Sequence, residues 1–205
     1  ASFTEIVGNS ALSQLQGKFV SNPDILAMIT KDNAQDIAFA LEFIDTGSNE
    51  EAALFANIDK LDAIMDLGNR FEGDPAKLAT VFSNLDQANA LSELSEELSV
   101  YQGRLDLIFE NADKASAILN TYKDIKDSGS TALMRDLFAS SESMDETLSN
   151  QGAINLLREY SEFKEEIDRY KDRAAEIDSL IELVGDEQRV DDIFANLDNF
   201  DKMSD

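Results

Sequence analysis

A six-residue phrase that returns along the chain decides the fold, and its first full copy reads Leu54-Phe55-Ala56-Asn57-Ile58-Asp59. The phrase consists of an aliphatic residue, Phe, any residue, Asn, an apolar residue and Asp. The other full copies are Val81-Phe82-Ser83-Asn84-Leu85-Asp86, Ile108-Phe109-Glu110-Asn111-Ala112-Asp113 and Ile193-Phe194-Ala195-Asn196-Leu197-Asp198. A worn copy keeps the Phe but not the Asn: Leu137-Phe138-Ala139-Ser140-Ser141-Glu142.

The phrases follow one another at a nearly constant distance. From Phe55 to Phe82, and again from Phe82 to Phe109, is 27 residues, and Phe138 follows 29 residues later. Glycines recur at comparable intervals, at positions 17, 47, 73, 103, 129, 152 and 185. Such a period in a helical chain is typical of stacked units that cannot bury their apolar faces alone. We therefore predict a repeat of about 28 residues with turns at these glycines.

The composition excludes several classes of function. The chain has 42 acidic and 17 basic residues among 205, and its net charge of −25 disfavours nucleic acid as a partner. It contains no Cys and no His, so the commonest nucleophile–base pairs and sulfur or imidazole metal ligands are missing. No apolar run is long enough to predict insertion into a membrane.

Helix signals run through the whole chain, and alternation typical of strands is missing. Asn22-Pro23 and Asp74-Pro75 each combine a capping residue with a Pro that suits the first helical position. Ser48 and Glu51 form a capping box before the first full phrase. We predict an all-α fold, an elongated stack of roughly seven or eight antiparallel helices.

Two stretches read as long uninterrupted helices. From Leu98 to Tyr122 the apolar residues step alternately by three and four, which is the spacing of a helical seam. From Leu157 to Val184 the same periodicity predicts one long amphipathic helix.

The phrase itself has two interpretations. In one it is a turn between two short helices, with Asn in the left-handed conformation and Asp capping the next helix. In the other it lies inside a continuous helix, and we favour this because the apolar phase runs unbroken through Leu54, Ile58 and Leu61. Phe would then fill the core and Asn flank it; alternatively, the Asn residues pair across neighbouring helices and fix their register. The motif residues, which we expect to be structural, are Phe55, Asn57, Asp59, Phe82, Asn84, Asp86, Phe109, Asn111, Asp113, Phe194, Asn196 and Asp198.

The same periodicity predicts the core of the stack. We expect these side chains to be buried: Leu54, Ile58, Leu61, Val81, Leu85, Leu98, Leu105, Ile108, Ala112, Leu119, Leu157, Ile167, Ile177, Ile193 and Leu197.

No pattern predicts an enzyme. There is no phosphate-binding loop, and 42 carboxylates make any single acidic pair uninformative. The segment 45–51 has oxygen ligands for calcium but not in the order of an EF-hand loop. We therefore assign no catalytic, cofactor-binding or metal-ligating residue.

The expected function is a non-enzymatic structural or protein-interaction module. We predict a single all-α repeat array over residues 1–205, as a fragment of a longer repetitive surface or scaffold protein that binds a protein partner or itself. The alternative is a calcium-dependent helical module that binds cations through its acidic edges. The acidic, cysteine-free composition favours the exterior of the cell over the cytoplasm.

Overall fold

Helices account for most of the described chain in the computed structural model. The structure describes residues 3–45, 47–185 and 189–200, and the side chains of these residues apart from 3–8, 198 and 200. These residues contain no strand, and the all-α prediction is confirmed. The helices are shorter and more numerous than the seven or eight expected. The chain divides into two compact units, Ala1–Ala115 (unit 1) and Ser116–Asp205 (unit 2).

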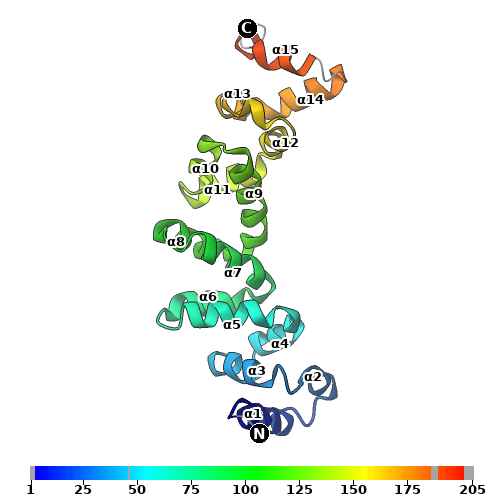
Figure 1. Ribbon diagram of the computed structural model, residues 1–205, viewed down its shortest axis with the longest axis vertical. Coiled ribbons are helices and arrows are strands. Elements are labelled where there is room, and N and C mark those ends of the chain that lie inside the picture. Colours follow the sequence, from blue (N-terminus) through cyan, green and yellow to red (C-terminus); the bar gives the residue numbers. More distant parts are fainter. Residues whose placement is uncertain (1–2, 46, 186–188, 201–205) are drawn as a thin grey trace. The chain divides into compact units, whose positions relative to one another are not determined.

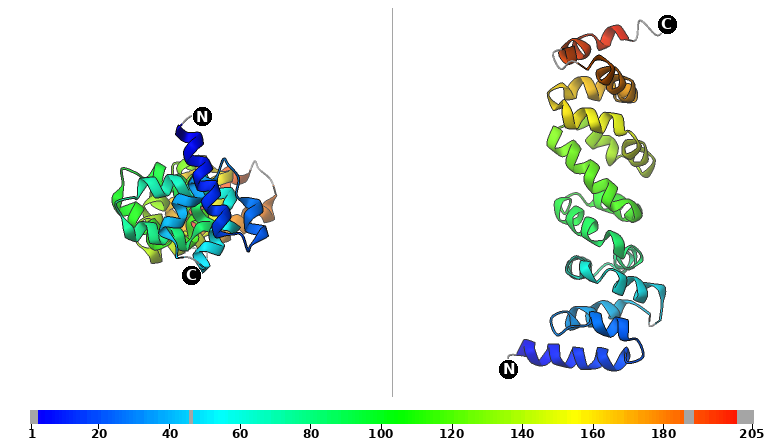
Figure 2. Two further views of the ribbon diagram at one scale, coloured as in Figure 1. Left: turned by 90° about the horizontal axis from the view of Figure 1, so that it is seen from below. Right: turned by 90° about the vertical axis from the view of Figure 1, so that its right-hand side faces the viewer.

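Unit 1 alternates α-helices with single turns of 3₁₀-helix, written η. Its elements are α1 Phe3–Lys18, α2 Pro23–Met28, α3 Ala34–Ala40, η1 Leu41–Phe43, α4 Asn49–Ala56, η2 Ile58–Lys60, α5 Leu61–Arg70, α6 Pro75–Ser83, η3 Leu85–Gln87, α7 Ala88–Glu97, α8 Gln102–Glu110 and η4 Ala112–Lys114. Helix α1 packs on α3, α3 on α5 and α5 on α7, while α4 packs on α6. Figure 1 and the right panel of Figure 2 show these helices as successive layers of the unit.

Unit 2 begins just inside α9, and its helices are connected in the same manner. Its elements are α9 Ala115–Ser128, α10 Thr131–Leu137, α11 Ser141–Ser149, α12 Gln151–Glu159, η5 Ser161–Phe163, α13 Lys164–Arg169, η6 Lys171–Arg173, α14 Ala174–Val184, α15 Val190–Ala195 and α16 Leu197–Phe200. Helix α10 packs on α11 and α13, and α12 packs on α13 and α14. Each unit is thus a solenoid-like stack by itself; a single array over residues 1–205 and a repeat of about 28 residues stay predictions.

The capping residues begin their helices as expected. The side-chain oxygen of Asn22 accepts the Ile25 N–H at 3.2 Å, and α2 begins at Pro23. Ser48 Oγ accepts the Glu51 N–H at 3.2 Å, and the Glu51 carboxylate accepts the N–H of Gly47 at 3.2 Å. Asp74 Oδ1 accepts the Lys77 N–H at 3.1 Å ahead of α6.

Both long helices predicted from periodicity are wrong. The first helix starts only at Gln102, after a turn over residues 98–101, and is divided at Asn111; the second is divided at Tyr160 and Tyr170. The glycine turns are confirmed in part. Glycines 47, 129 and 185 adopt positive φ, and glycine 73 lies in a turn, whereas glycines 17, 103 and 152 lie inside helices.

The predicted core agrees closely with the buried side chains. Thirteen of the fifteen expected residues are buried, and only Ile58 and Ile193 are half-buried. The largest fully buried side chains of unit 1 include Ile37, Leu54, Ile64, Leu67, Leu85, Leu91, Leu94, Leu98 and Ile108; those of unit 2 include Ile118, Ile125 and Leu133.

Candidate functional site

The repeated phrase is a corner between two helices. Helix α4 ends at Ala56, Asn57 takes φ −118° and ψ 30°, and one turn of 3₁₀-helix leads into α5. Asn84 (−135°, 44°) and Asn111 (−121°, 33°) occupy the same position after α6 and α8. The favoured interpretation, a continuous helix through the phrase, is therefore wrong. The turn interpretation describes the chain, but φ is negative, so Asn does not adopt the left-handed conformation.

Each Asn side chain closes the helix that it ends. The Nδ2 group donates to the carbonyl oxygen four residues earlier, and the acceptors are Ala53, Thr80 and Leu107 at 2.9 Å and Asp192 at 2.7 Å. At Asn84 the backbone N–H bonds to Val81, three residues back, which leaves the Thr80 carbonyl to the amide. Carbonyls at a helix end need such partners. The expectation that the amides pair across neighbouring helices is wrong for these donors.

The phenylalanines of the phrase join one helical layer to the next. Phe55 meets Phe19 edge to face, with centroids 5.1 Å apart, and Phe109 meets Phe71 in the same way at 4.9 Å. Phe82 stacks on Phe43 at 5.4 Å. In unit 1, a ring at the end of η1 or directly after α1 or α5 thus meets the phrase ring near the end of α4, α6 or α8. Aromatic pairs add about 0.5–1.5 kcal/mol beyond burial.

Unit 2 uses the same kind of contact. Phe194 of the last phrase stacks on Phe163 at 4.3 Å and also lies near Tyr160. In the worn copy, Phe138 lies 6.1 Å from Tyr122.

One of these rings is covered by an ion-paired lysine. Lys77 Nζ lies 5.7 Å from the centroid of Phe109, 2.7 Å from an Asp106 oxygen and 3.0 Å from an Asp74 oxygen. The hydrogen bonds to Asp106 and Asp74 raise the pKa of Lys77 above its ordinary range. This cation therefore ties α6 to α8 over the ring contact.

The aspartates of the phrase do not cap the following helix. Asp59 is the second residue of its 3₁₀ turn, its side chain is exposed, and the turn receives no side-chain cap. Asp86 and Asp113 occupy the same place and are exposed too. Acidic residues at the start of a helical segment suit its dipole. The side chain of Asp198 lies outside the described residues.

The structure brings some motif residues together and keeps others apart. The 3₁₀ turns that follow Asn84 and Asn111 pack on each other, so two of the phrases are neighbours in unit 1. The fourth full phrase lies in unit 2, at the α15–α16 corner.

Two further corners carry no phrase, and sequence reasoning missed them. Tyr160 (−132°, 49°) and Tyr170 (−110°, 21°) each end a helix and precede one 3₁₀ turn. Here the backbone N–H itself reaches four residues back, to the carbonyls of Leu156 and Glu166, so no side-chain amide is needed. The signal shared with the phrase is an acidic residue two positions after the corner, Glu162 or Asp172.

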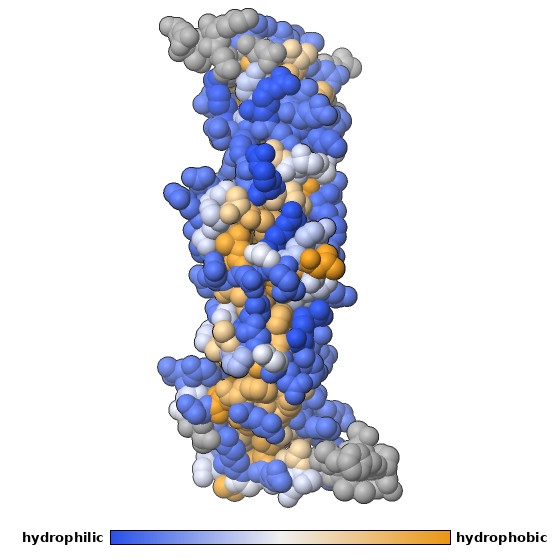
Figure 3. Space-filling model, turned by 90° about the vertical axis from the view of Figure 1, so that its left-hand side faces the viewer, coloured by the Kyte–Doolittle hydropathy of each residue, from blue (hydrophilic) through white to orange (hydrophobic). Residues whose placement is uncertain are grey.

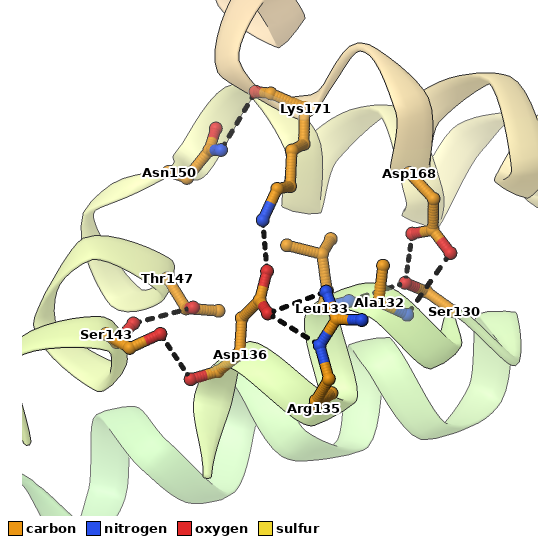
Figure 4. A network of polar contacts seen from close by, with 10 residues as sticks. All are labelled: Ser130, Ala132, Leu133, Arg135, Asp136, Ser143, Thr147, Asn150, Asp168 and Lys171. Carbon is orange, nitrogen blue, oxygen red and sulfur yellow. Dashed lines mark hydrogen bonds and ion pairs between the residues drawn. The ribbon is translucent and has the colours of Figure 1, made fainter. Parts of the chain in front are cut away.

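A network of polar side chains in unit 2 was also missed (Figure 4). Ser130 caps α10 by accepting the Leu133 N–H at 3.2 Å, and its hydroxyl donates to Asp168 of α13. The other Asp168 oxygen accepts the Ala132 N–H at 3.3 Å. A carboxylate from a neighbouring helix thus reinforces the start of α10.

The second half of this network surrounds Asp136. Its carboxylate accepts hydrogen bonds from Lys171 of η6 and from Arg135. Burial raises the pKa of Asp136, but the hydrogen bonds and positive charges of Lys171 and Arg135 outweigh it and hold the pKa below its ordinary value. Asn150 caps α12 and donates its Nδ2 to the Lys171 carbonyl at 2.9 Å.

A polar pocket of about 220 Å³ lies beside this network and is lined in part by Asp136, Thr147 and Lys171. The Thr147 hydroxyl donates to the Ser143 carbonyl at 2.8 Å, and the Ser143 hydroxyl donates to the Asp136 carbonyl at 2.8 Å. These groups satisfy one another and the helix ends around them. The arrangement therefore fixes α10, α11 and α13.

The acidic side chains of the described residues do not gather into a metal-binding group. No group of three or more carboxylates among them is placed to hold an ion. In the segment considered for calcium, Ser48 and Glu51 serve as helix caps, and residue 46 lies outside the description. The sequence has two other acidic pairs that we considered for calcium: residues 186–187 lie outside the described residues, and Asp191 and Asp192 are exposed on α15.

Comparisons with known proteins found no similar protein. The chain matches no family model, no curated protein and no solved structure. Within the described residues, no helix combines the length and hydropathy needed to cross a membrane.

Proposed function

We propose that this chain is a non-enzymatic protein-interaction module, a helical scaffold that forms part of a longer repetitive surface or scaffold protein. The observation that carries the proposal is the use of the repeated residues. Phe of each phrase packs on an aromatic ring, and Asn satisfies a carbonyl of its own helix. What the sequence repeats is therefore a means of stacking helices.

The surface supports the same proposal. On the face shown in Figure 3, apolar residues gather in patches bordered by hydrophilic ones. Each unit exposes the outer faces of its stacked helices, and helical repeat proteins recognise partners through such surfaces. The net charge of −25 keeps such a stack soluble and favours partners with basic surfaces.

The test is quantitative affinity capture with the full chain as bait. An unrelated acidic α-helical protein of matched charge serves as the control bait. We expect a defined partner that, once purified, binds saturably near physiological salt. Binding should be lost when Leu91→Asp and Leu156→Asp are combined, because each change places a charge in the core of one unit and the pair unfolds both. Equal capture by the control bait, or binding that survives unfolding, would contradict the proposal.

A further inference from the structure

The solvent side of α14 exposes an unusual amount of apolar surface. The Leu183 side chain is 83% exposed, and Leu180 and Val184 beside it are half-buried. Successive helical residues are 100° apart, so these three form one stripe. A groove of about 450 Å³ runs beside the stripe and is lined by Leu180, Val184 and, from α15, Ile193.

An acidic pocket lies on the other flank of the same helix. Its volume is about 260 Å³, and its lining includes the carboxylates of Glu159, Asp178 and Glu182 and no basic side chain. On the circumference of α14, Leu183 lies between this pocket and the groove. We call Leu180, Leu183, Val184 and Ile193, together with Glu159, Asp178 and Glu182, the α14 surface.

We propose that the α14 surface binds an amphipathic helix of a protein partner, with a leucine-rich face flanked by Lys or Arg. The inference rests on the proposed function and specifies the partner. Apolar residues of the partner at i, i+3 and i+4 would cover Leu183 and enter the groove. A flanking basic side chain is long enough to reach the acidic pocket with its charged end.

Charge decides between this partner and a second copy of the chain. Three carboxylates line the pocket, and Asp191 and Asp192 lie exposed on α15 near the groove, where Arg189 is the only basic lining residue. A second copy would bring another chain of net charge −25 against these carboxylates. A basic helix gains from the same charges.

The test uses peptides of known sequence and the full chain. The probe is a Leu/Lys amphipathic peptide of about 18 residues, long enough to form a helix. Its matched controls are the same peptide with Glu for Lys and a scrambled peptide of identical composition. We expect saturable binding of the probe alone, measured by fluorescence anisotropy and weakened by added salt.

Variants locate the binding. Leu183→Glu and Glu182→Lys should each weaken probe binding about tenfold or more. Val100→Glu is the matched control because Val100 is 78% exposed in the α7–α8 turn of unit 1, and it should leave binding unchanged. Both α14 variants change exposed residues, and circular dichroism should show unaltered helix content.

Three results would overturn the inference. Binding that Leu183→Glu and Glu182→Lys do not weaken would place the probe elsewhere. Equal binding of the scrambled peptide would mean that net charge alone attracts it. A dimer in sedimentation experiments that Leu183→Glu abolishes would make a second copy the occupant. If a native partner binds Leu183→Glu as tightly as the parent chain, the α14 surface is not its binding site, but the proposed interaction module is unaffected. If the parent chain captures no partner at all, the proposed function itself is contradicted.

Discussion

A corner of unit 1 that carries the phrase and a corner of unit 2 that lacks it satisfy the last carbonyl groups of their helices in different ways. At Asn84 and Asn111 of unit 1 the backbone N–H reaches three residues back, and the Asn amide supplies the bond to the carbonyl four residues back. At Tyr160 and Tyr170 of unit 2 the backbone N–H makes that bond itself. The comparison teaches that the corner does not require the phrase. What the phrase adds is a side-chain bond and a ring for the next layer.

The units also differ in the side-chain contacts that join neighbouring helices. Ring pairs recur at each step of unit 1. Unit 2 has ring pairs as well, but it joins α10 to α13 and η6 through Ser130, Asp136, Asp168 and Lys171. Rings contribute through buried area, while buried ion pairs return little more than their desolvation costs. We therefore expect the loss of the buried Phe109 in unit 1 to cost more stability than the loss of the half-buried Phe138 in unit 2.

Phe109→Ala should have the largest effect. Phe109 is buried against Phe71 and carries Lys77 over its face, so its loss should cost about 3–5 kcal/mol of unfolding free energy. Phe138→Ala in unit 2 should cost about half as much, because that ring is half-buried. Urea unfolding followed by circular dichroism measures both; equal losses would show that the worn copy holds its unit as firmly.

A pair of glycines gives the next largest difference. Gly152 and Gly103 are each the second residue of a helix, α12 and α8. A Cβ on Gly152 would lie 2.7 Å from the backbone nitrogen of Ala175, whereas a Cβ on Gly103 would meet nothing within 4 Å. Gly152→Ala should therefore cost about 1–3 kcal/mol or more.

Gly103→Ala is its matched control and should stabilise by about 0.4–1 kcal/mol, because Ala lowers the entropy of the unfolded chain. Thermal melting of the two variants measures the contrast. A harmless Gly152→Ala would mean that α12 and α14 do not approach as closely as described.

Asn84→Ala tests the corner directly. The change leaves the Thr80 carbonyl without its amide donor and should cost about 1 kcal/mol. Asn84→Gly should cost at least as much, because φ at this residue is −135° and does not call for Gly. Chemical denaturation of both variants measures these losses in unfolding free energy. A Gly variant as stable as the parent would mean that Asn84 is used for its backbone conformation and not for its side-chain hydrogen bond.

Removal of two buried hydroxyl groups should change the stability of the protein differently. Thr147 of unit 2 donates to the Ser143 carbonyl, so Thr147→Val should cost about 1 kcal/mol. Ser95 of unit 1 is fully buried and its hydroxyl has no partner, so Ser95→Ala should be neutral or stabilise by up to about 1 kcal/mol. Calorimetric melting of the two variants tests this; a destabilised Ser95→Ala would reveal a bond to that hydroxyl.

Acidification should produce the smallest effects, with opposite signs. Burial and the nearby Asp62 raise the pKa of Asp36 in unit 1, so the folded state binds this proton more readily than the unfolded state. Protonation of Asp36 therefore adds stability as the pH falls through its raised pKa. Asp136 in unit 2 has a lowered pKa, so its contribution is full above the ordinary carboxyl pKa and is lost as the pH falls through the lowered value.

Asp36→Asn and Asp136→Asn each remove one of these dependences. We expect changes below about 1 kcal/mol, because both carboxylates keep some access to water. Unfolding free energies measured between neutral pH and pH 3 test the signs. A parent chain that loses no stability relative to Asp136→Asn in acid would contradict the assignment.

The sequence predicts the helical class, the capped helix starts and most of the core, because these depend on local chemistry and apolar periodicity. It does not locate the corners. A 3₁₀ turn has three residues per turn, so apolar residues three positions apart stay on one face, as residues three or four apart do in an α-helix. Leu54, Ile58 and Leu61 therefore look continuous although the helix ends between them.

The polar network could not be predicted for another reason. Asp136 lies 35 residues from Lys171, and Ser130 lies 38 from Asp168. Among 42 carboxylates, nothing in the composition singles out these two. Only the packing of α10 on α13 does so.

The register of the ring pairs has an evolutionary consequence. In unit 1 each phrase ring meets a ring that lies one helix pair earlier in the chain: Phe19 with Phe55, Phe43 with Phe82, and Phe71 with Phe109. A duplicated or deleted helix pair, such as α3–α4 or α5–α6, would carry with it one ring that packs on the preceding pair and one that packs on the following pair. The flanking pairs would then find complementary partners at once. Such a gene can change its length by recombination within its own repeats without first inventing a new contact.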